Sequence, residues 1–447
     1  MSNKRKKTCL ALSGAIMASL ISITASAVET SLSGFGTLGY AQSNQSYNYE
    51  RFISNSGTVK RDSIFGVQAD IKFTDSIGAT VQGKFAPSLS NDTGWASTLS
   101  WAFASWRPAN DWLVRLGKQR VGLYLFSESQ DVGETYDFAH LPTEMYSISP
   151  STDYVGASVS KTWNPSIGEV TLDAYSGTIS TNWRIYQRDN VQIPSSSMQP
   201  GANFKNISVN SSGFALTWLR DEDKYRASVQ TQTTAIDPSS PAYYSQLTGS
   251  QINVNLTGAT SGTAYSVLPQ ALIGSVNSVV FTLGTEIHLP QDFRLIGEYG
   301  RRQVTNGLSG IDTHGGYLAL LKDVDAWTPY VSYAQIQSRS DALSLYQAMN
   351  SNAGLTDLTG GFGGAALTGA VNTINASQRV LADGLLVYDQ NTIALGTSYR
   401  INPTQKLKAE WARTHVGVAS SFVDAPSGGN VSNQNIDVLS FSYNFVF

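Results

Sequence analysis

The 447-residue sequence has little of three things: cysteine, charged residues and long apolar runs. Its one cysteine is Cys9, so disulfides do not stabilise the rest of the chain. Only 14% of the residues are charged, and after the first 27 residues no apolar run reaches the ~20 residues that a transmembrane helix needs. No segment shows the period of an amphipathic helix. Helical bundles, helical membrane proteins and disulfide-rich secreted domains are therefore disfavoured.

The first 27 residues have the pattern of a secretory signal peptide. Residues 4–7 are all basic, residues 9–23 are mainly apolar, and Ala25-Ser26-Ala27 is a small-x-small cleavage site. We therefore expect residues 1–27 to be cleaved and residues 28–447 to form a single domain. Removing four of the 30 Lys and Arg leaves 26 against 33 Asp and Glu, a net charge of about −7 that argues against nucleic acid as a partner.

The chain is rich in short segments that alternate apolar and polar residues. In residues 64–74 one face is polar and the other is apolar with an aromatic at each end, and residues 74–76 are turn formers that lead into a second such segment, 77–85. This is typical of strands that cross a membrane in a barrel. A soluble β-sandwich also alternates, but it has no reason to place aromatics at both ends. The apolar face comprises Phe65, Val67, Ala69, Ile71 and Phe73.

The same rule predicts sixteen strands along the chain. Short turns such as 108–111, 290–292 and 402–404 alternate with long segments such as 232–277 and 334–391. Short turns on one rim and long loops on the other are typical of outer-membrane barrels, with the short turns in the periplasm. We therefore predict an all-β, 16-stranded antiparallel transmembrane β-barrel, located in a bacterial outer membrane. Whether the two longest loops cover the barrel stays open. The predicted strands are 31–40, 64–74, 77–85, 98–106, 112–118, 154–162, 169–175, 213–219, 225–231, 278–289, 293–299, 314–321, 327–333, 392–399, 407–414 and 436–447.

The last nine residues, 439–447, place an apolar or aromatic side chain at every second position and end on phenylalanine. An unpaired aromatic edge strand invites aggregation, so it is tolerated mainly where the sheet closes on itself. The segment resembles the C-terminal signature that the outer-membrane assembly machinery recognises. The residues of this predicted assembly signal are Phe441, Tyr443, Phe445 and Phe447.

Two segments, 104–107 and 112–120, resemble the fourth and fifth strands of the general porins of Gram-negative bacteria, and the likeness extends along nearly all of residues 28–447. The resemblance implies a water-filled channel for passive diffusion of small hydrophilic solutes and ions. It also implies a homotrimer in contact with outer-membrane lipid and lipopolysaccharide. In that family the third loop folds inward and narrows the pore. Here the third loop, 119–152, lacks a clear copy of the Pro-Glu-Phe-Gly-type tip of some members.

By the same resemblance, acids of the third loop are expected to face a basic wall across the pore. Three cations lie on the inward face of the predicted strands, and a fourth directly follows the fifth strand, so these four are candidates for the basic wall. The alternative is that they are ordinary solvated residues of the lumen wall. The candidate basic residues are Lys72, Lys84, Arg115 and Arg120. The candidate acidic residues are Glu128, Asp131, Glu134 and Asp137.

Other functions have weaker support in the sequence. None of the four histidines lies in a recognised catalytic motif, and no metal-binding or phosphate-binding pattern is present, so we expect no enzyme and no cofactor. A substrate-specific channel for sugars or aromatic compounds is a closer alternative, with Tyr175 and Tyr330 as candidate lumen residues. A barrel that serves as an adhesin or anchor would use the same long loops but would not conduct.

Overall fold

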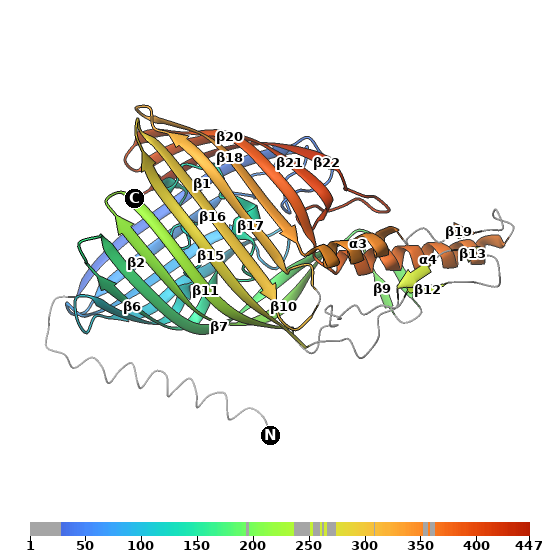
Figure 1. The fold of residues 1–447 in the computed structure, drawn as a ribbon, viewed down its shortest axis with the longest axis horizontal. Helices are drawn as coiled ribbons and strands as arrows, with labels where there is room; N and C mark the ends of the chain where they lie inside the picture. The colour runs from blue at the N-terminus through green and yellow to red at the C-terminus, as the bar shows by residue number, and fades with distance from the viewer. Residues whose placement is uncertain are drawn as a thin grey trace, which may run out of the picture.

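A computed structural model describes residues 28–447 except 194–195, 237–250, 254–259, 262, 266–273, 308, 352–355 and 358–362. The predicted signal peptide, 1–27, lies outside the described residues, as does most of the long loop 232–277. Within the described part, sixteen strands form one closed barrel (Figure 1). They are β1 (Glu29–Ser43), β2 (Ile64–Lys72), β3 (Ile77–Pro87), β4 (Trp95–Trp106), β5 (Trp112–Arg120), β6 (Asp153–Trp163), β7 (Glu169–Gln187), β10 (Gly201–Arg220), β11 (Asp223–Ile236), β15 (Ser275–Leu289), β16 (Phe293–Val304), β17 (Thr313–Lys322), β18 (Trp327–Ser338), β20 (Tyr388–Asn402), β21 (Gln405–Ser420) and β22 (Gln434–Val446).

Every barrel strand pairs antiparallel with its neighbours in the chain order, and β1 closes the sheet against β22. Each of the sixteen predicted segments coincides with one of these strands, so the predicted fold class is confirmed. Closure pairs the backbone N–H and C=O groups that lipid cannot solvate. Outside the barrel, the described residues form three small sheets: β8 (Val191–Ile193) with β9 (Ser196–Met198), β12 (Gln251–Asn253) with β14 (Thr263–Tyr265), and β13 (Thr260–Ser261) with β19 (Thr356–Asp357).

The outer surface of the barrel is apolar, as the alternation predicts. Leu32 and Leu38 on β1 are 71% and 65% exposed, whereas Ala41 on the opposite face is fully buried. Four exposed tryptophans lie at the strand ends next to the short turns, where the amphipathic ring suits the membrane–water interface. They are Trp106, Trp112, Trp163 and Trp327. The closed barrel with its apolar outer surface is the architecture of a bacterial outer-membrane protein, as predicted.

The C-terminal aromatics seal the junction between β1 and β22 on the lipid side. The Phe447 ring covers Gly34, so a Cβ at Gly34 would lie 2.2 Å from a ring carbon, and the Phe445 ring covers Gly36 in the same way. Phe447 also stacks on Phe65 of β2, with ring centroids 6.1 Å apart. The backbone of Phe447 exchanges hydrogen bonds of 2.8 and 3.0 Å with Gly34. Glycine at these positions therefore allows the rings to lie flat across the closing strands.

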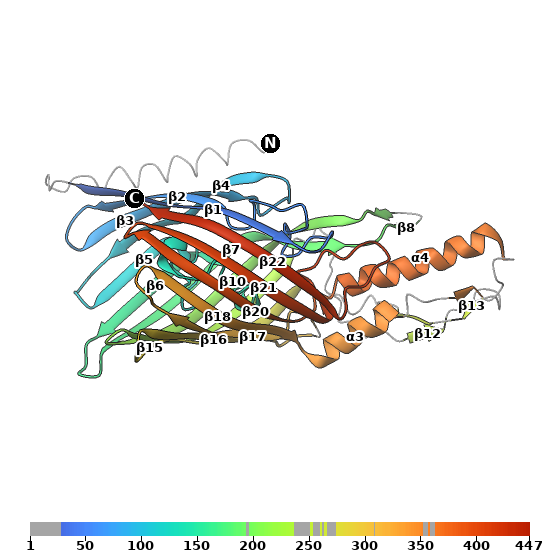
Figure 2. The same ribbon diagram turned by 90° about the horizontal axis from the view of Figure 1, so that it is seen from above.

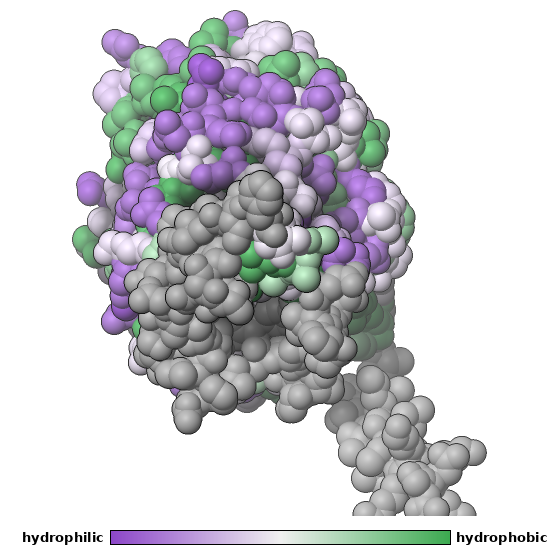
Figure 3. Space-filling view, turned by 90° about the vertical axis from the view of Figure 1, so that its right-hand side faces the viewer, coloured by the Kyte–Doolittle hydropathy of each residue, from purple (hydrophilic) through white to green (hydrophobic). Residues whose placement is uncertain are grey.

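The two ends of the barrel differ. The C-terminus lies at the end opposite α3 (Ser340–Ser351) and α4 (Gly364–Asp383), which project beyond the other rim (Figures 1 and 2). Seen from that rim, the described surface is largely hydrophilic, with hydrophobic patches along its edges (Figure 3). β7 and β10 extend to 19 and 20 residues and continue past the barrel on this side.

The two helices α3 and α4 project from the rim although no segment of the sequence shows the period of an amphipathic helix. The segment of α4 is rich in glycine, alanine, asparagine and threonine, so its apolar stripe is weak in the sequence, and the helix is stabilised by tertiary contacts. Val371, Ala376 and Val380 form its buried face. Neither this helix nor any other described helix is long and apolar enough to cross a membrane. Since α3 and α4 lie in loop 334–391, the described part of this loop projects from the rim.

A buried arginine fixes α4 to the end of β7, where that strand continues past the barrel. Arg188, which follows β7, is 1% exposed and forms an ion pair of 2.8 Å with Asp383 at the end of α4. Its guanidinium also donates to the Tyr346 hydroxyl on α3 and to the carbonyl of Gly429 in the last loop. Nearby, Arg379 of α4 pairs with Asp189. These contacts join four segments that are far apart in the sequence.

Replacing Ala69 with Arg tests the assignment of faces. Ala69 lies on the lipid side of β2 and Gln68 on the lumen side, where it bonds to Asp70 and Gln82. Ala69→Arg is expected to destabilise the barrel by about 2 to 4 kcal/mol because it places a charge at the bilayer midplane. Gln68→Arg is expected to be nearly neutral. The measurement is urea unfolding in lipid vesicles, and equal costs at the two positions would refute the assignment.

Replacing Phe447 with Asp tests the terminal strand. The change removes the ring that covers Gly34 and stacks on Phe65, and it alters the predicted assembly signal. We expect less protein in the outer membrane and more precursor in the periplasm, measured by cell fractionation. Leu439→Ala, on the lipid face of the same strand, is the control and is expected to insert normally. Normal amounts of heat-modifiable barrel with Asp at position 447 would contradict the prediction.

Candidate pore constriction

The third loop, residues 121–152, folds into the barrel and packs against the lumen wall. It contains the short 3-10 helix η1 (Gly133–Thr135) and the one-turn helix α2 (Thr143–Tyr146). Phe138 of the loop is 1% exposed, and its ring meets the edges of Tyr317 and Tyr330, with centroids 5.8 and 5.2 Å away. Leu123, Met145 and Ile148 are buried in the same cluster. The loop is therefore anchored by an apolar core inside a polar lumen.

A carboxylate on β16 adds a polar anchor to this core. Glu298 is buried and accepts three hydrogen bonds: 2.7 Å from the backbone N–H of Leu125, 2.5 Å from the Tyr146 hydroxyl and 2.9 Å from the Tyr317 hydroxyl. Two of these donors belong to the third loop and one to β17. A buried polar group needs such partners, because an unsatisfied one costs about 1 to 3 kcal/mol. Glu298 thus ties the start and the α2 turn of the loop to the wall.

Asp131 contacts the basic wall directly. Its carboxylate lies 2.7 Å from Lys84 Nζ on β3 and 2.6 Å from Arg120 Nη2 at the end of β5. Arg120 pairs as well with Asp153, at 2.9 Å. Burial acts to raise the pKa of Asp131, but Arg120 and Lys84 outweigh it and hold the pKa below its ordinary value. Three predicted residues therefore meet in one ion-pair network, and they fasten the loop to the wall.

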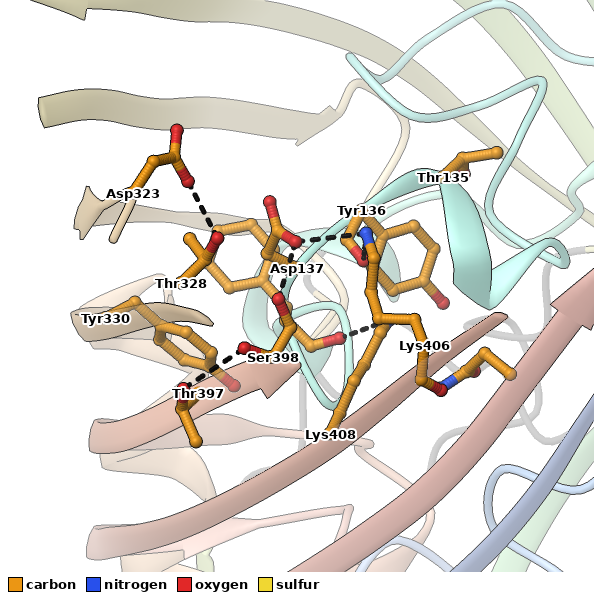
Figure 4. A network of polar contacts seen from close by, with 12 residues as sticks. Thr135, Tyr136, Asp137, Asp323, Thr328, Tyr330, Thr397, Ser398, Lys406 and Lys408 are labelled. Carbon is orange, nitrogen blue, oxygen red and sulfur yellow. Dashed lines mark hydrogen bonds and ion pairs between the residues drawn. The ribbon is translucent and has the colours of Figure 1, made fainter. Parts of the chain in front are cut away.

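Asp137 reaches a different part of the wall (Figure 4). Its carboxylate accepts three hydrogen bonds. The donors are Arg294 on β16 at 2.5 Å, Lys406 on β21 at 3.0 Å and the Ser398 hydroxyl on β20 at 2.7 Å. Lys408, on the next inward position of β21, donates to the carbonyl of Phe138. The tip of the loop is therefore held by three cations on β16 and β21, whereas Lys84 and Arg120 lie on β3 and β5.

The first loop, residues 44–63, also contacts the lumen. The Tyr49 hydroxyl lies 3.3 Å from Thr414 Oγ1 on β21, and Arg61 donates to Ser440 on β22. Asp62 lies 2.7 Å from Nδ1 of His140 on the third loop. The two loops are thus joined inside the barrel, which the sequence analysis did not predict.

The other ring nitrogen of His140, Nε2, lies 3.3 Å from the Thr143 hydroxyl. Asp62, His140 and Thr143 therefore form a chain of the acid–base–hydroxyl type. The adjacent cavity has a volume of only about 40 Å3, which suits a few waters and leaves no room for a substrate. We interpret the chain as the contact that holds the first and third loops together.

A larger cavity remains between the third loop and the wall formed by β4 to β7 and β11. This wall cavity has a volume of about 240 Å3. Arg115 and Arg120 of β5, Glu128 of the loop and Arg226 of β11 contribute charges of both signs. The Arg115 guanidinium lies over the Phe103 ring, 5.4 Å from its centroid. Among the described residues neither Arg115 nor Glu128 has an ion-pair partner within 4.0 Å, so both charges are available to a solute.

Two predicted site residues do not join this arrangement. Lys72 is the last residue of β2, 53% exposed, and it pairs at 2.9 Å with Asp75 of the adjoining turn. The prediction that Lys72 lies in the constriction is therefore wrong, because its strand ends at the rim and an acid three residues away is the nearest partner. Glu134 lies in η1 and is half-buried, and the described residues give it no ion pair.

Sequence reasoning missed several cations that donate to the loop, Lys408 among them. Arg226, Arg294 and Lys406 donate to the loop at Gly122 and Asp137. Arg226 and Arg294 lie within the predicted strands 225–231 and 293–299, and Lys406 directly precedes the predicted strand 407–414. No local signal shows that a loop between β5 and β6 reaches β16 and β21, so their partner was not predictable. Among the described residues, no group of His, Cys, Asp and Glu lies close enough to hold a metal ion.

No protein-family model and no curated protein matches this chain. Solved structures with a similar fold include OmpT, an outer membrane protein of Vibrio cholerae, at 12% identity over 95% of this chain and 99% of that chain, with a TM-score of 0.48. An anion-selective porin from Comamonas acidovorans matches at 11% identity over 94% of this chain and all of that one, with a TM-score of 0.48. OprB of Pseudomonas putida matches at 10% identity over 94% of both chains, with a TM-score of 0.48. Porins are thus among the chains with a similar fold. Likeness at this level carries no information about the site of this chain or the solutes it handles.

Replacing Asp137 with Asn tests whether the tip anchor holds the loop. Arg294 and Lys406 would lose their shared carboxylate, and removing one partner of a buried ion pair costs about 3 to 5 kcal/mol. We expect a larger and noisier single-channel current in planar bilayers, because the loop tip leaves the wall more often. Asp221→Asn, in the exposed turn between β10 and β11, is the control. A current with the mean and noise of the wild type would show that Asp137 does not restrain the loop.

Proposed function

We propose that this chain forms a water-filled channel for passive diffusion of small hydrophilic solutes and ions across the outer membrane. The observation that carries the proposal is a sixteen-stranded barrel whose lumen is narrowed by its third loop and keeps a charged cavity beside it. Side chains alone do not fill a barrel of this size, so its interior contains water. The inward loop then sets the width of the narrowest part.

The arrangement of charges supports a selective role for the remaining cavity. Lys84 and Arg120 pair with Asp131 and Asp153 in a network that fastens the loop. Arg115 and Glu128 line the cavity without such partners. Fixed charges that remain unpaired in a narrow pore act on permeating ions, because the field there is strong and counter-charges are few. We therefore assign ion selectivity to the unpaired charges that line this cavity, Arg115 and Glu128 among them.

The proposal includes partners that follow from the resemblance to general porins. The protein is expected to form a homotrimer, to contact outer-membrane lipid and lipopolysaccharide, and to insert through the outer-membrane assembly machinery. A trimer would give conductance steps in multiples of three and a heat-labile band in gel electrophoresis. We propose no catalytic activity, since the histidine with a triad-like pattern, His140, faces a cavity of about 40 Å3. A barrel that does not conduct would instead favour an adhesin or anchor.

Replacing Arg115 with Gln tests the assignment of selectivity. Loss of the cation is expected to raise the ratio of cation to anion permeability by about twofold or more at 0.1 M salt, because one charge a few ångströms from an ion contributes about 1 kcal/mol even in water. The shift should shrink at 1 M salt, where charges are screened beyond about 3 Å. The measurement is the reversal potential in a salt gradient. Lys72→Gln, at the rim, is the control and should leave the potential unchanged; an unchanged potential for Arg115→Gln would refute the assignment.

A further inference from the structure

One stretch of the lumen wall gathers four aromatic rings around the wall cavity. Trp101 and Phe103 lie on β4, Tyr154 on β6 and Tyr175 on β7. Trp101 and Phe103 are tilted against each other with centroids 6.2 Å apart, and Tyr154 and Tyr175 stack at 5.2 Å. Tyr154 and Tyr175 are 2% and 7% exposed and belong to the apolar cluster that anchors the third loop, whereas Trp101 and Phe103 are partly exposed. Trp101 and Phe103, two positions apart on β4, therefore provide the partly exposed apolar surface of the cavity, against which a flat solute can pack.

Charges of alternating sign surround these rings. Along the wall, Arg115 of β5 is followed by Asp173 of β7 and by Arg226 of β11, and Glu128 approaches from the loop. Asp173 accepts from the Ser160 hydroxyl, and Arg226 donates to the Thr217 hydroxyl and the Gly122 carbonyl, so their polar partners are neutral. None of Arg115, Asp173 and Arg226 has an ion pair among the described residues. The cavity thus offers strong donors and strong acceptors at once.

We propose that the wall cavity is a binding site for a small neutral sugar, an inference that rests on the proposed channel function. The hydroxyls of a sugar both donate and accept, so they match carboxylates and guanidiniums that alternate along the wall. The apolar C–H face of a sugar ring packs against aromatic rings. The interleaved charges favour a neutral solute, because an anion near Arg115 or Arg226 also meets Asp173 and Glu128, and the reverse holds for a cation.

The test is the effect of glucose on single-channel current through the reconstituted full-length protein. A sugar that binds in the cavity is expected to lower the potassium chloride current in a saturable way. Trp101→Ala should raise the half-blocking concentration by roughly fivefold or more, since it removes one of the rings. Asp173→Asn should raise it as well by removing a charged acceptor. Trp106→Ala, which lies on the same strand but is exposed on the outer face, is the matched control and should block like the wild type.

Each other outcome is informative. A channel that conducts without saturable block by glucose would overturn the sugar site and leave the diffusion channel intact. Saturable block by benzoate or by phenylalanine, with no effect of glucose, would replace the sugar with an aromatic anion or an aromatic zwitterion. Equal half-blocking concentrations for Trp101→Ala and Trp106→Ala would place the sugar elsewhere. A protein that inserts as a barrel but does not conduct would overturn the channel function and this inference together.

Discussion

The whole structure depends on one requirement: in lipid, every backbone N–H and C=O must find a partner within the protein. Sixteen strands meet it by pairing in a closed ring, in which β1 accepts β22 as its last neighbour. The closing seam is also where side chains are most constrained, with the Phe445 and Phe447 rings lying across Gly36 and Gly34. A closed barrel of sixteen strands has a lumen too wide for side chains to fill, so the loops determine which solutes can pass.

The third loop occupies that lumen by using two kinds of contact at once. Apolar side chains packed around Phe138 form a small core. Asp131, Asp137 and the wall residue Glu298 add ion pairs and hydrogen bonds between the loop and separate parts of the wall. Buried charges are tolerated there because each has a charged or hydrogen-bonding partner. The first loop adds Asp62 and Tyr49 to the same half of the lumen. The wall from β4 to β7 and β11 is left with the open cavity and its unpaired charges.

The barrel was predictable from the sequence because its signal is local. Alternation along one strand decides which side chains face lipid, and the aromatic rims and short turns mark each end, so all sixteen segments were located. The site was predictable only in part. Arg120 and Asp131 were candidates because the family resemblance implies an acidic third loop that faces a basic wall, whereas the bonds from Asp137 to Arg294 and Lys406 join residues more than 150 positions apart. Helix α4 escaped notice because packing against β7 and β8, rather than its own weak apolar stripe, stabilises it.

The central claim is that water fills a path past the third loop. The most direct measurement is the swelling rate of liposomes that contain the purified protein, in isotonic solutions of neutral solutes of increasing size. The account predicts fast swelling with solutes as small as glycerol and a steep decline as solute size approaches that of the wall cavity. Liposomes that do not swell in any of these solutes, although the protein has inserted as a folded barrel, would contradict it.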